Sequence, residues 1–496
     1  MQCSLIILAC FSLSLLNEAA TSRIFQRGRL RGGLLGEPNV NYSETLPPDE
    51  WFIQQLDHFD PTNRRTWKQR YFTNASFHQP GGPVFLMIGG EGKASPLWMV
   101  TGQWITYAKQ YNALCFQLEH RYYGKSHPTQ DLSVKNLVYL SSEQALADIA
   151  YFIEGMNKKH NLTLGTKWVV FGGSYPGSLA AWARAKYPHL VHAAVSASGP
   201  LLAKSDFGEY YRVVSDALAT SSADCVSAVE RATAQISIML QHMVGQQTLK
   251  KMFRLCDPIN PKIKNDLSNL FESLASNFAG VVQYNKDNRQ FEGAKATNIT
   301  IDVVCNIMVN DSIGQPVSRY AAVNSLLLDA YGQECLDYKY SKMIEEMKAI
   351  SWDNETAEGG RQWTYQTCTE FGFYQTSSKE PKLFGDNFPV DFFIQQCSDI
   401  FGPKYNSDFL KAVTYRTNTL YGAFALQATR VVYVHGSIDP WHALGITHTL
   451  LSDSPAIFIQ GTAHCANMYP SAPNDPPQLI AARKKVGNLI GKWLLL

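Results

Sequence analysis

The stretch that most constrains the fold runs from Trp168 to Gly177 and has the pattern of a strand, a tight turn and a helix around one serine. The apolar run 169–171 stops at Gly172-Gly173, and a helix-favouring segment follows Ser174. Glycines before the serine let strand and helix approach without a Cβ clash, and backbone N–H groups at the helix start face the space above the serine. The pattern predicts a nucleophile elbow, with an ordinary turn as the alternative.

The elbow departs from the usual Gly-x-Ser-x-Gly pattern at one position. Pro176 stands where the last glycine is expected, and Gly177 follows it. Proline is tolerated in the first turn of a helix because its missing N–H has no helical partner there. We therefore still expect an elbow at this place.

Strands and helices alternate around the elbow. Strands are predicted at 83–88, 113–118 and 193–197, and helices at 97–111 and 141–158. This alternation predicts a parallel sheet covered by helices on both faces, with the active site at the carboxyl ends of the strands.

A glycine loop, Gly89-Gly90-Glu91-Gly92, directly follows the first of these strands. Such a loop lets backbone N–H groups approach a ligand or a developing oxyanion, and an ordinary turn is the alternative. The spacing of a phosphate-binding loop is absent, which disfavours nucleotide binding.

The pattern changes at about Lys204. From 205 to 420 it is mostly helical, with helices expected at 207–218, 223–244, 263–278 and 317–331, and the segment holds six cysteines. We interpret 205–420 as a disulfide-stapled helical cap inserted into an α/β core made of 51–204 and 421–496. In the second part of the core, strands are predicted at 430–434 and 456–459, and a last helix at 478–493.

Three residues with complementary chemistry follow predicted strands in the order Ser174, Asp439, His464. Serine needs a base to become a nucleophile, histidine can take and return the proton, and a carboxylate fixes the imidazole tautomer. This is the chain order of an α/β-hydrolase triad. The N–H of Tyr175 and the loop at Gly90 are the predicted oxyanion pocket. A plain turn at Asp439 and an ordinary histidine at 464 are the alternatives.

The amino-terminal end is typical of a secretory protein. Residues 1–21 have the apolar core and small residues of a signal peptide, with an uncleaved anchor as the alternative. Residues 22–50 form a basic leader, read as a short propeptide or a disordered start. Six glycosylation sequons support the same compartment: they begin at Asn41, Asn74, Asn161, Asn298, Asn310 and Asn354. No later stretch has the roughly 18 unbroken apolar residues of a membrane span.

Cysteine usage and charge narrow the function further. Of ten cysteines, eight remain after the signal, and no Cys-x-x-Cys occurs, which favours disulfides over a zinc or redox site. The six in the cap are Cys225, Cys256, Cys305, Cys335, Cys368 and Cys397, and spacing alone does not fix their pairing. A net charge of +2 gives no sign of nucleic-acid binding. We expect neither a metal nor an organic cofactor.

Five short segments carry a resemblance to a known family. They are Gly89–Gly92, Glu119–Gly124, Gly172–Trp182, Asp439–Trp441 and Gly461–His464, within a match from about Trp51 to the end. In them the chain resembles the serine peptidase family of prolyl carboxypeptidase, dipeptidyl peptidase II and thymus-specific serine protease. The run 139–148 and Ser178 look most like the thymus-specific branch.

The resemblance implies an α/β-hydrolase with a helical cap that cleaves short peptides beside proline, in lysosomal or endosomal vesicles or after secretion. It implies Ser174 as nucleophile, Asp439 as orienter and His464 as base. Trp441 would line the S1 pocket, and Glu91 would meet a peptide amino terminus.

The family also implies three cap disulfides, with Cys115 and Cys465 left free. The pairs are Cys225 with Cys305, Cys256 with Cys335, and Cys368 with Cys397. One departure concerns specificity, because Ser178 stands where prolyl carboxypeptidases tend to carry a methionine that lines S1. The inference of a peptidase is therefore firmer than that of a proline preference.

Two other functions share these features. A lipase or esterase can have the same elbow and chain order, and a non-catalytic binding protein can keep the fold. Long-chain ester turnover without peptide turnover would favour the first. Within the peptidase reading, carboxypeptidase and dipeptidyl peptidase both stay open, as does a homodimer.

Overall fold

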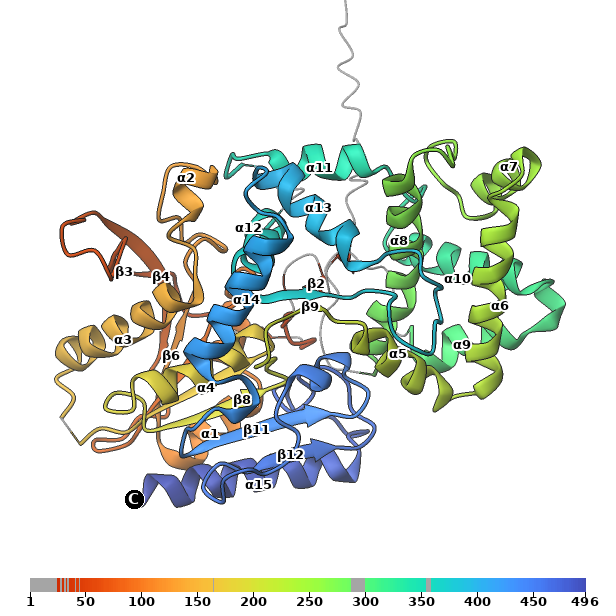
Figure 1. Cartoon of the computed structure of the whole chain (residues 1–496). Coiled ribbons are helices and arrows are strands. Elements are labelled where there is room, and N and C mark those ends of the chain that lie inside the picture. The colour runs from red at the N-terminus through yellow and green to blue at the C-terminus, as the bar shows by residue number, and fades with distance from the viewer. Residues whose placement is uncertain are drawn as a thin grey trace, which may run out of the picture.

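The computed structural model describes residues 25–496 except 27, 28, 31, 32, 34, 41, 44, 164, 287–298 and 354–357. The predicted signal peptide and the sequons at Asn41, Asn298 and Asn354 lie outside the described residues. An eight-stranded sheet forms the centre of the α/β part, in the order β12-β11-β8-β7-β5-β6-β4-β3 (Figure 1).

Six neighbouring strands of this sheet run parallel, as predicted. They are β5 (Val84–Ile88), β6 (Leu114–Leu118), β7 (Trp168–Gly173), β8 (Ala193–Ala197), β11 (Val431–Gly436) and β12 (Ala456–Ile459). Two antiparallel strands, β3 (Glu50–Gln55) and β4 (Thr66–Asn74), extend the edge beside β6 and were not predicted. The first five parallel strands are buried throughout, which is typical of a sheet covered on both faces.

Alternate residues of each strand enter different apolar clusters, because successive side chains point to opposite faces. Phe85 and Phe171 pack in a cluster with α1 (Gln103–Tyr111) and α15 (Pro477–Leu494). Leu86 and Val170 pack in the other cluster, with α3 (Ser142–Lys159) and α4 (Tyr175–Lys186). This second cluster continues without a break into the helical insertion, so the core and the insertion share apolar packing.

The elements from β9 to α14 lie between β8 and β11, and we call them the cap. In Figure 1, α6 to α10 form a bundle beside the sheet, and α11 to α14 lie above it. The helices are α5 (Glu209–Ala219), α6 (Ala223–Met239), α7 (Met243–Met252), α8 (Lys264–Gln283), α9 (Ile301–Val309), α10 (Pro316–Ala330), α11 (Tyr340–Lys348), α12 (Gly360–Gln366), α13 (Val390–Phe401) and α14 (Ser407–Tyr421). A small parallel sheet joins β9 (Lys204–Asp206) to β10 (Gly372–Tyr374).

Three disulfides tie the cap together, with the pairs that the resemblance implies. Cys225–Cys305 links α6 to α9, Cys256–Cys335 links the loops after α7 and α10, and Cys368–Cys397 links α13 to a π-helical turn, η4 (Thr367–Phe371). Cys115 and Cys465 are buried free thiols.

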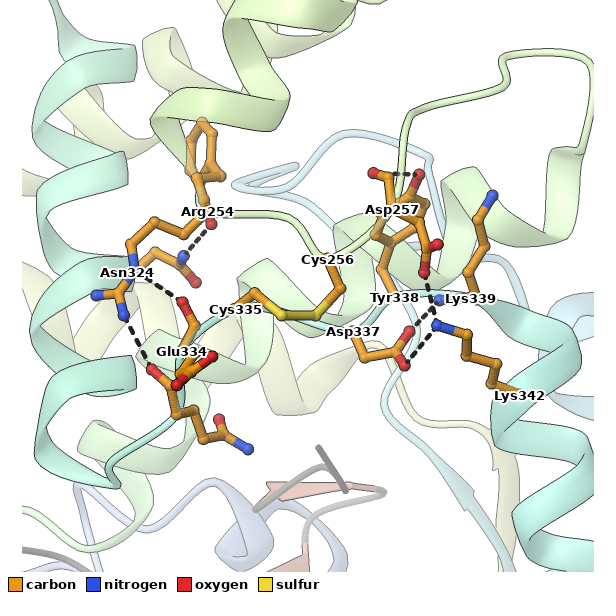
Figure 2. The surroundings of a disulfide bond; sticks show 12 residues. Arg254, Cys256, Asp257, Asn324, Glu334, Cys335, Asp337, Tyr338, Lys339 and Lys342 are labelled. Atoms are coloured by element: carbon orange, nitrogen blue, oxygen red, sulfur yellow. Dashed lines mark hydrogen bonds and ion pairs between the residues drawn. A yellow bond between two sulfur atoms is a disulfide. The ribbon is translucent and has the colours of Figure 1, made fainter. Parts of the chain in front are cut away.

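The bond between Cys256 and Cys335 is flanked by hydrogen bonds between the same two loops (Figure 2). On one side Arg254 donates to the carbonyls of Gln333 and Glu334. On the other, Lys342 forms ion pairs with Asp257 and Asp337. The two loops are therefore joined by side-chain contacts on both sides of the disulfide as well as by the disulfide itself.

Two expected helices are interrupted. The helix expected at 97–111 is a short 3₁₀ turn, η1 (Pro96–Met99), followed by α1, because Gly102 between them has a φ of 95° that ends helical geometry. The helix expected at 223–244 is split into α6 and α7. A Cβ on Gly245 would lie 2.1 Å from the carbonyl oxygen of Met239, so glycine allows the two helix ends to pack closely.

The predicted α/β-hydrolase fold with a disulfide-stapled helical cap is confirmed. The last helix and the helix behind the Ser141 cap lie where the sequence places them. The hydroxyl of Ser141 accepts a hydrogen bond from the N–H of Gln144 at the start of α3, as an N-cap should.

Candidate active site

Ser174 lies at a sharp turn between β7 and α4. Its φ is 67°, a left-handed conformation that is uncommon for a residue with a side chain. The turn is fixed by a hydrogen bond from the N–H of Ser174 to the carbonyl of Ala197, at 2.8 Å. A Cβ on Gly172 would lie 2.0 Å from the carbonyl oxygen of Pro176, so only glycine fits at the position two residues before Ser174. The local geometry is that of an elbow.

Pro176 is part of the contact between the elbow and the glycine loop. A Cβ built on Gly90 would lie 2.3 Å from Cγ of Pro176, so the loop after β5 reaches the elbow only because position 90 is glycine. Pro176, the residue that departs from the common elbow pattern, therefore packs against a glycine 86 positions earlier in the chain. Tyr175 and Gly90, the two predicted oxyanion positions, come from segments that touch.

Asp439 and His464 follow β11 and β12 and hydrogen-bond to each other. The distance from Nδ1 of His464 to Oδ1 of Asp439 is 2.8 Å, and both residues are buried. The same Oδ1 accepts the N–H of Trp441 at 3.0 Å, which caps the 3₁₀ turn η6 (Pro440–Leu444) and holds the carboxylate in place.

The electrostatics of this pair favour a charged carboxylate. Burial raises the pKa of Asp439, but the neighbouring imidazole of His464 outweighs it and the net pKa is lowered. Burial lowers the pKa of His464, but the Asp439 carboxylate outweighs it and the net pKa is raised. The imidazole is therefore oriented through Nδ1 and made a stronger base.

Oγ of Ser174 and Nε2 of His464 are both buried, and within the described part of the chain neither has a hydrogen-bond partner. The structure thus holds the carboxylate–imidazole bond but no bond from the imidazole to the serine. The hydrogen bond between a catalytic histidine and its serine is often long in enzymes without substrate, and it tightens when substrate binds.

A cap residue that the sequence did not single out joins the two loops around the site. Gln283, the last residue of α8, is fully buried, and its carbonyl accepts the N–H of His464 at 2.9 Å. Its side-chain oxygen accepts the indole N–H of Trp441 at 2.9 Å and the hydroxyl of Tyr210 at 2.7 Å. A glutamine near the end of a predicted helix gives no local sequence signal for such a role.

Trp441 lies in an aromatic cluster beside His464. Its ring centroid is 6.4 Å from that of His464 and 5.5–5.9 Å from those of Phe207, Tyr210 and Phe373. The last three residues come from the cap, so core and cap build this wall together. Ser178, which stands at the other position that the resemblance links to specificity, is buried, and its hydroxyl donates to the carbonyl of Pro200 at 2.7 Å.

The segment Glu119–Gly124 contributes to a buried hydrogen-bond network around the side chain of Tyr175, next to the elbow serine. Nε2 of His120 lies 3.1 Å from the hydroxyl of Tyr175, which also accepts a hydrogen bond from Gln366 of the cap. Gln366 in turn accepts the hydroxyl of Tyr123 at 2.7 Å. This buried network fixes the Tyr175 side chain and thereby the start of α4.

Two buried charges in the same region are held by hydrogen bonds. Arg121 binds both oxygens of Asp148 at 2.6 Å. Glu119 accepts hydrogen bonds from Arg70 and from the N–H groups of Ala94 and Lys125. The motif that carries the resemblance here is therefore largely structural.

Glu91 is buried beside a pocket at the carboxyl end of β5. The pocket is lined by Gly89–Ala94, by Pro176 and by residues of the leader. Nε of Arg29 donates to the carbonyl of Glu91 at 2.8 Å. This contact between the leader and the glycine loop was not predicted from the sequence.

The described residues also bear on the predictions about metals, membranes and glycosylation. They contain no group of three or more His, Cys, Asp or Glu side chains that could hold a metal ion. None of the described helices is long and apolar enough to cross a membrane. Of the described sequons, Asn161 and Asn310 are exposed, and Asn74 is partly buried with its amide donating to the carbonyl of Met99 at 2.7 Å.

Comparison with known proteins identifies the family. The family model described as "Serine carboxypeptidase S28" matches residues 54–486. The thymus-specific serine protease of Mus musculus is 34% identical, over 90% of this chain and 88% of its own. The lysosomal Pro-X carboxypeptidase of Mus musculus is 27% identical, over 93% of each chain. The Caenorhabditis elegans protein K12H4.7, named as a serine protease, is 39% identical, over 96% of this chain and 95% of its own. The chain therefore belongs to the serine carboxypeptidase S28 family of serine peptidases.

Proposed function

We propose that the protein is a secretory-pathway exopeptidase that cleaves short peptides with Ser174, His464 and Asp439 as its catalytic triad. The observation that carries this proposal is the buried 2.8 Å bond between His464 and Asp439, at the sheet edge where the elbow presents Ser174. In the proposal, an oriented and strengthened base and a strained serine turn meet at the carboxyl ends of the strands.

The reaction follows from these roles. Nε2 of His464 takes the proton from Oγ of Ser174 as Oγ bonds to the scissile carbonyl carbon, and the carbonyl oxygen becomes an oxyanion. The N–H groups of Tyr175 and Gly90 are the proposed donors to that oxyanion. The C–N bond then breaks and the leaving amine takes the proton from His464. A water molecule repeats the sequence on the acyl-enzyme, which releases the acid and returns the proton to Oγ.

The proposed substrate is a short peptide, with a preference near proline. The cap shares its apolar core with the sheet and supplies part of the aromatic wall around Trp441, which we propose as the S1 wall. A covered site of this kind suits chain ends better than folded proteins. One relative is named as a Pro-X carboxypeptidase, and the flat aromatic wall is compatible with a proline ring.

The proposed location is a lysosomal or endosomal vesicle, or the exterior after secretion. It rests on the signal-like residues 1–21, the sequons and the three disulfides, which are typical of oxidising compartments. A lysosomal relative supports the first of these locations.

The test combines covalent labelling with a substrate panel. Purified glycoprotein is incubated with a fluorophosphonate probe and then assayed on short peptides with proline or small residues at P1, at pH 5 and pH 7. Ser174→Ala should lose labelling and cleavage together, whereas Ser351→Ala, at an exposed cap serine, should keep both. The cleaved end of each peptide, read by mass spectrometry, separates carboxypeptidase from dipeptidyl peptidase activity.

Three results would overturn parts of the proposal. A folded wild type that neither labels nor cleaves would indicate a binding protein. Turnover of long-chain esters with no turnover of peptides would indicate a lipase or esterase. Digestion of intact casein would contradict restriction to short peptides.

A further inference from the structure

Described residues of the leader lie beside the glycine loop and the elbow of the candidate active site. Five of the leader's described residues, Arg29, Gly33, Leu35, Gly36 and Glu37, are called the leader segment here. Four of these, Gly33 and Leu35 to Glu37, line the pocket beside the glycine loop, together with Pro176 of the elbow. Figure 1 shows the neighbouring strand β2 (Arg29–Leu30) in the middle of the molecule, between the sheet and the cap.

Arg29 bridges the core and the cap. It is buried, with Nε donating to the carbonyl of Glu91 at 2.8 Å and Nη2 donating to the carbonyl of Glu358 at 2.7 Å. Burying a guanidinium is costly unless it is paired and hydrogen-bonded. Here two carbonyls accept its hydrogen bonds, and although Glu91 and Glu358 attract the charge, burial outweighs them and lowers the pKa of Arg29. Arg29 is therefore held by hydrogen bonds that tie the leader to both the core and the cap.

The following residues pass the glycine loop and reach the elbow. A Cβ on Gly33 would lie 3.3 Å from Cα of Gly92, which shows how closely the two backbones run. The methyl groups of Leu35 lie 3.3–3.4 Å from the position of a Cβ on Gly173, the residue before Ser174. The carbonyl of Gly36 accepts the hydroxyl of Tyr469 at 3.2 Å, in the segment that follows His464.

We propose that the leader segment occupies the peptide-binding cleft in place of substrate, so that the chain with its leader is held inhibited. The inference rests on the proposed function, because it takes this cleft to be the peptide-binding one. The contacts are those expected of a bound peptide, with backbone against the glycine loop, an apolar side chain at the elbow and an arginine side chain bonded to the carbonyl of Glu91. A substrate cannot lie against the same stretch of the glycine loop while these residues lie against it.

The experiment compares one protein with and without its leader. A recognition sequence for a site-specific protease is inserted after the exposed residue Thr45, and mass spectrometry verifies that the purified protein starts before Arg29. Cleavage and removal of the fragment should raise both the rate of fluorophosphonate labelling and kcat/KM. If the leader fills the cleft in about nine molecules of ten, the increase is about tenfold. Equal rates before and after removal would overturn the inference.

Point variants separate specific occupancy from general loosening. Arg29→Ala in the uncleaved chain should raise the labelling rate, and the matched Arg64→Ala, at an exposed arginine on the far edge of the sheet, should not. A synthetic peptide of residues 25–37 should inhibit the cleaved enzyme competitively, and the same peptide with alanine at position 29 should inhibit less. Inhibition that does not compete with substrate would contradict occupancy of the cleft.

The inference stays testable if the peptidase proposal fails. A fluorescent peptide of residues 25–37 can be titrated into the cleaved Ser174→Ala protein, where polarisation reports binding without any turnover. Binding without labelling in any form would leave the cleft inference standing and remove the catalytic proposal. No binding at millimolar peptide would remove the cleft inference itself.

Discussion

Replacing Gln283 by methionine should damage the site without touching the triad. The change removes the oxygen that accepts the indole of Trp441 and the hydroxyl of Tyr210, and leaves both donors buried. An unsatisfied buried donor costs about 1–3 kcal/mol, so two place the loss of unfolding free energy at about 2–6 kcal/mol. The bond from the N–H of His464 to the carbonyl of residue 283 remains, because it uses the main chain.

The assay is a KM and kcat measurement on the folded variant. Because Trp441 is the proposed S1 wall and loses its anchor, we expect KM for peptides to rise, whereas kcat should fall less than in a triad variant. The fluorophosphonate probe, which does not need S1, should still label Ser174. Gln395→Met, at an exposed cap glutamine that donates to Asp399 at 2.7 Å, is the matched control.

A second variant at Gln283 tests the same positioning role by keeping the acceptor oxygen and changing the charge. Gln283→Glu keeps an acceptor for both donors but adds a negative charge near His464, so the pKa of the imidazole should rise further. The acid limb of the kcat/KM profile should then move to higher pH. A folded Gln283→Met with wild-type KM and kcat, together with an unshifted profile in Gln283→Glu, would refute a positioning role.

Three further predictions concern the pair, the network and the elbow. Asp439→Asn should lower kcat about 10³–10⁴-fold with little change in peptide binding, because the imidazole loses its tautomer control; kinetics and a melting curve check this. Glu370 joins the buried network behind Tyr175 by accepting a hydrogen bond from Gln366 at 3.1 Å. Burial raises the pKa of Glu370 to about 7, against hydrogen bonds from Ser142 that lower it. Stability from this raised pKa is present below the ordinary value of about 4.5 and is lost as the pH rises through about 7. The wild type should therefore melt higher at pH 5 than at pH 8, and Glu370→Gln should lose that difference. Gly90→Ala should slow acylation because its Cβ would lie 2.3 Å from Pro176, and Pro176→Ala should restore part of the rate in the double variant; additive losses would contradict the contact.

Local sequence signals were enough to predict the strands and the elbow of this protein. Fully apolar runs predicted the parallel strands, and glycines around Ser174 predicted the elbow, because steric demands of that turn act within a few residues. The chain order Ser174, Asp439, His464 predicted a triad, of which the structure shows the hydrogen bond between Asp439 and His464. The exact breaks in two helices were missed, since Gly102 and Gly245 act through φ and close packing that helical periodicity does not register.

The tertiary structure decided everything that depends on residues far apart in the chain. The fit of Pro176 against Gly90, the bonds of Gln283 to Trp441 and His464, and the burial of Arg29 at Glu91 each join distant segments. No local pattern encodes such contacts, because the free energy of each is set by burial and by the partner that folding brings. The sequence could therefore predict the residues of the proposed triad, and only the fold could show which distant residues contact them and the glycine loop.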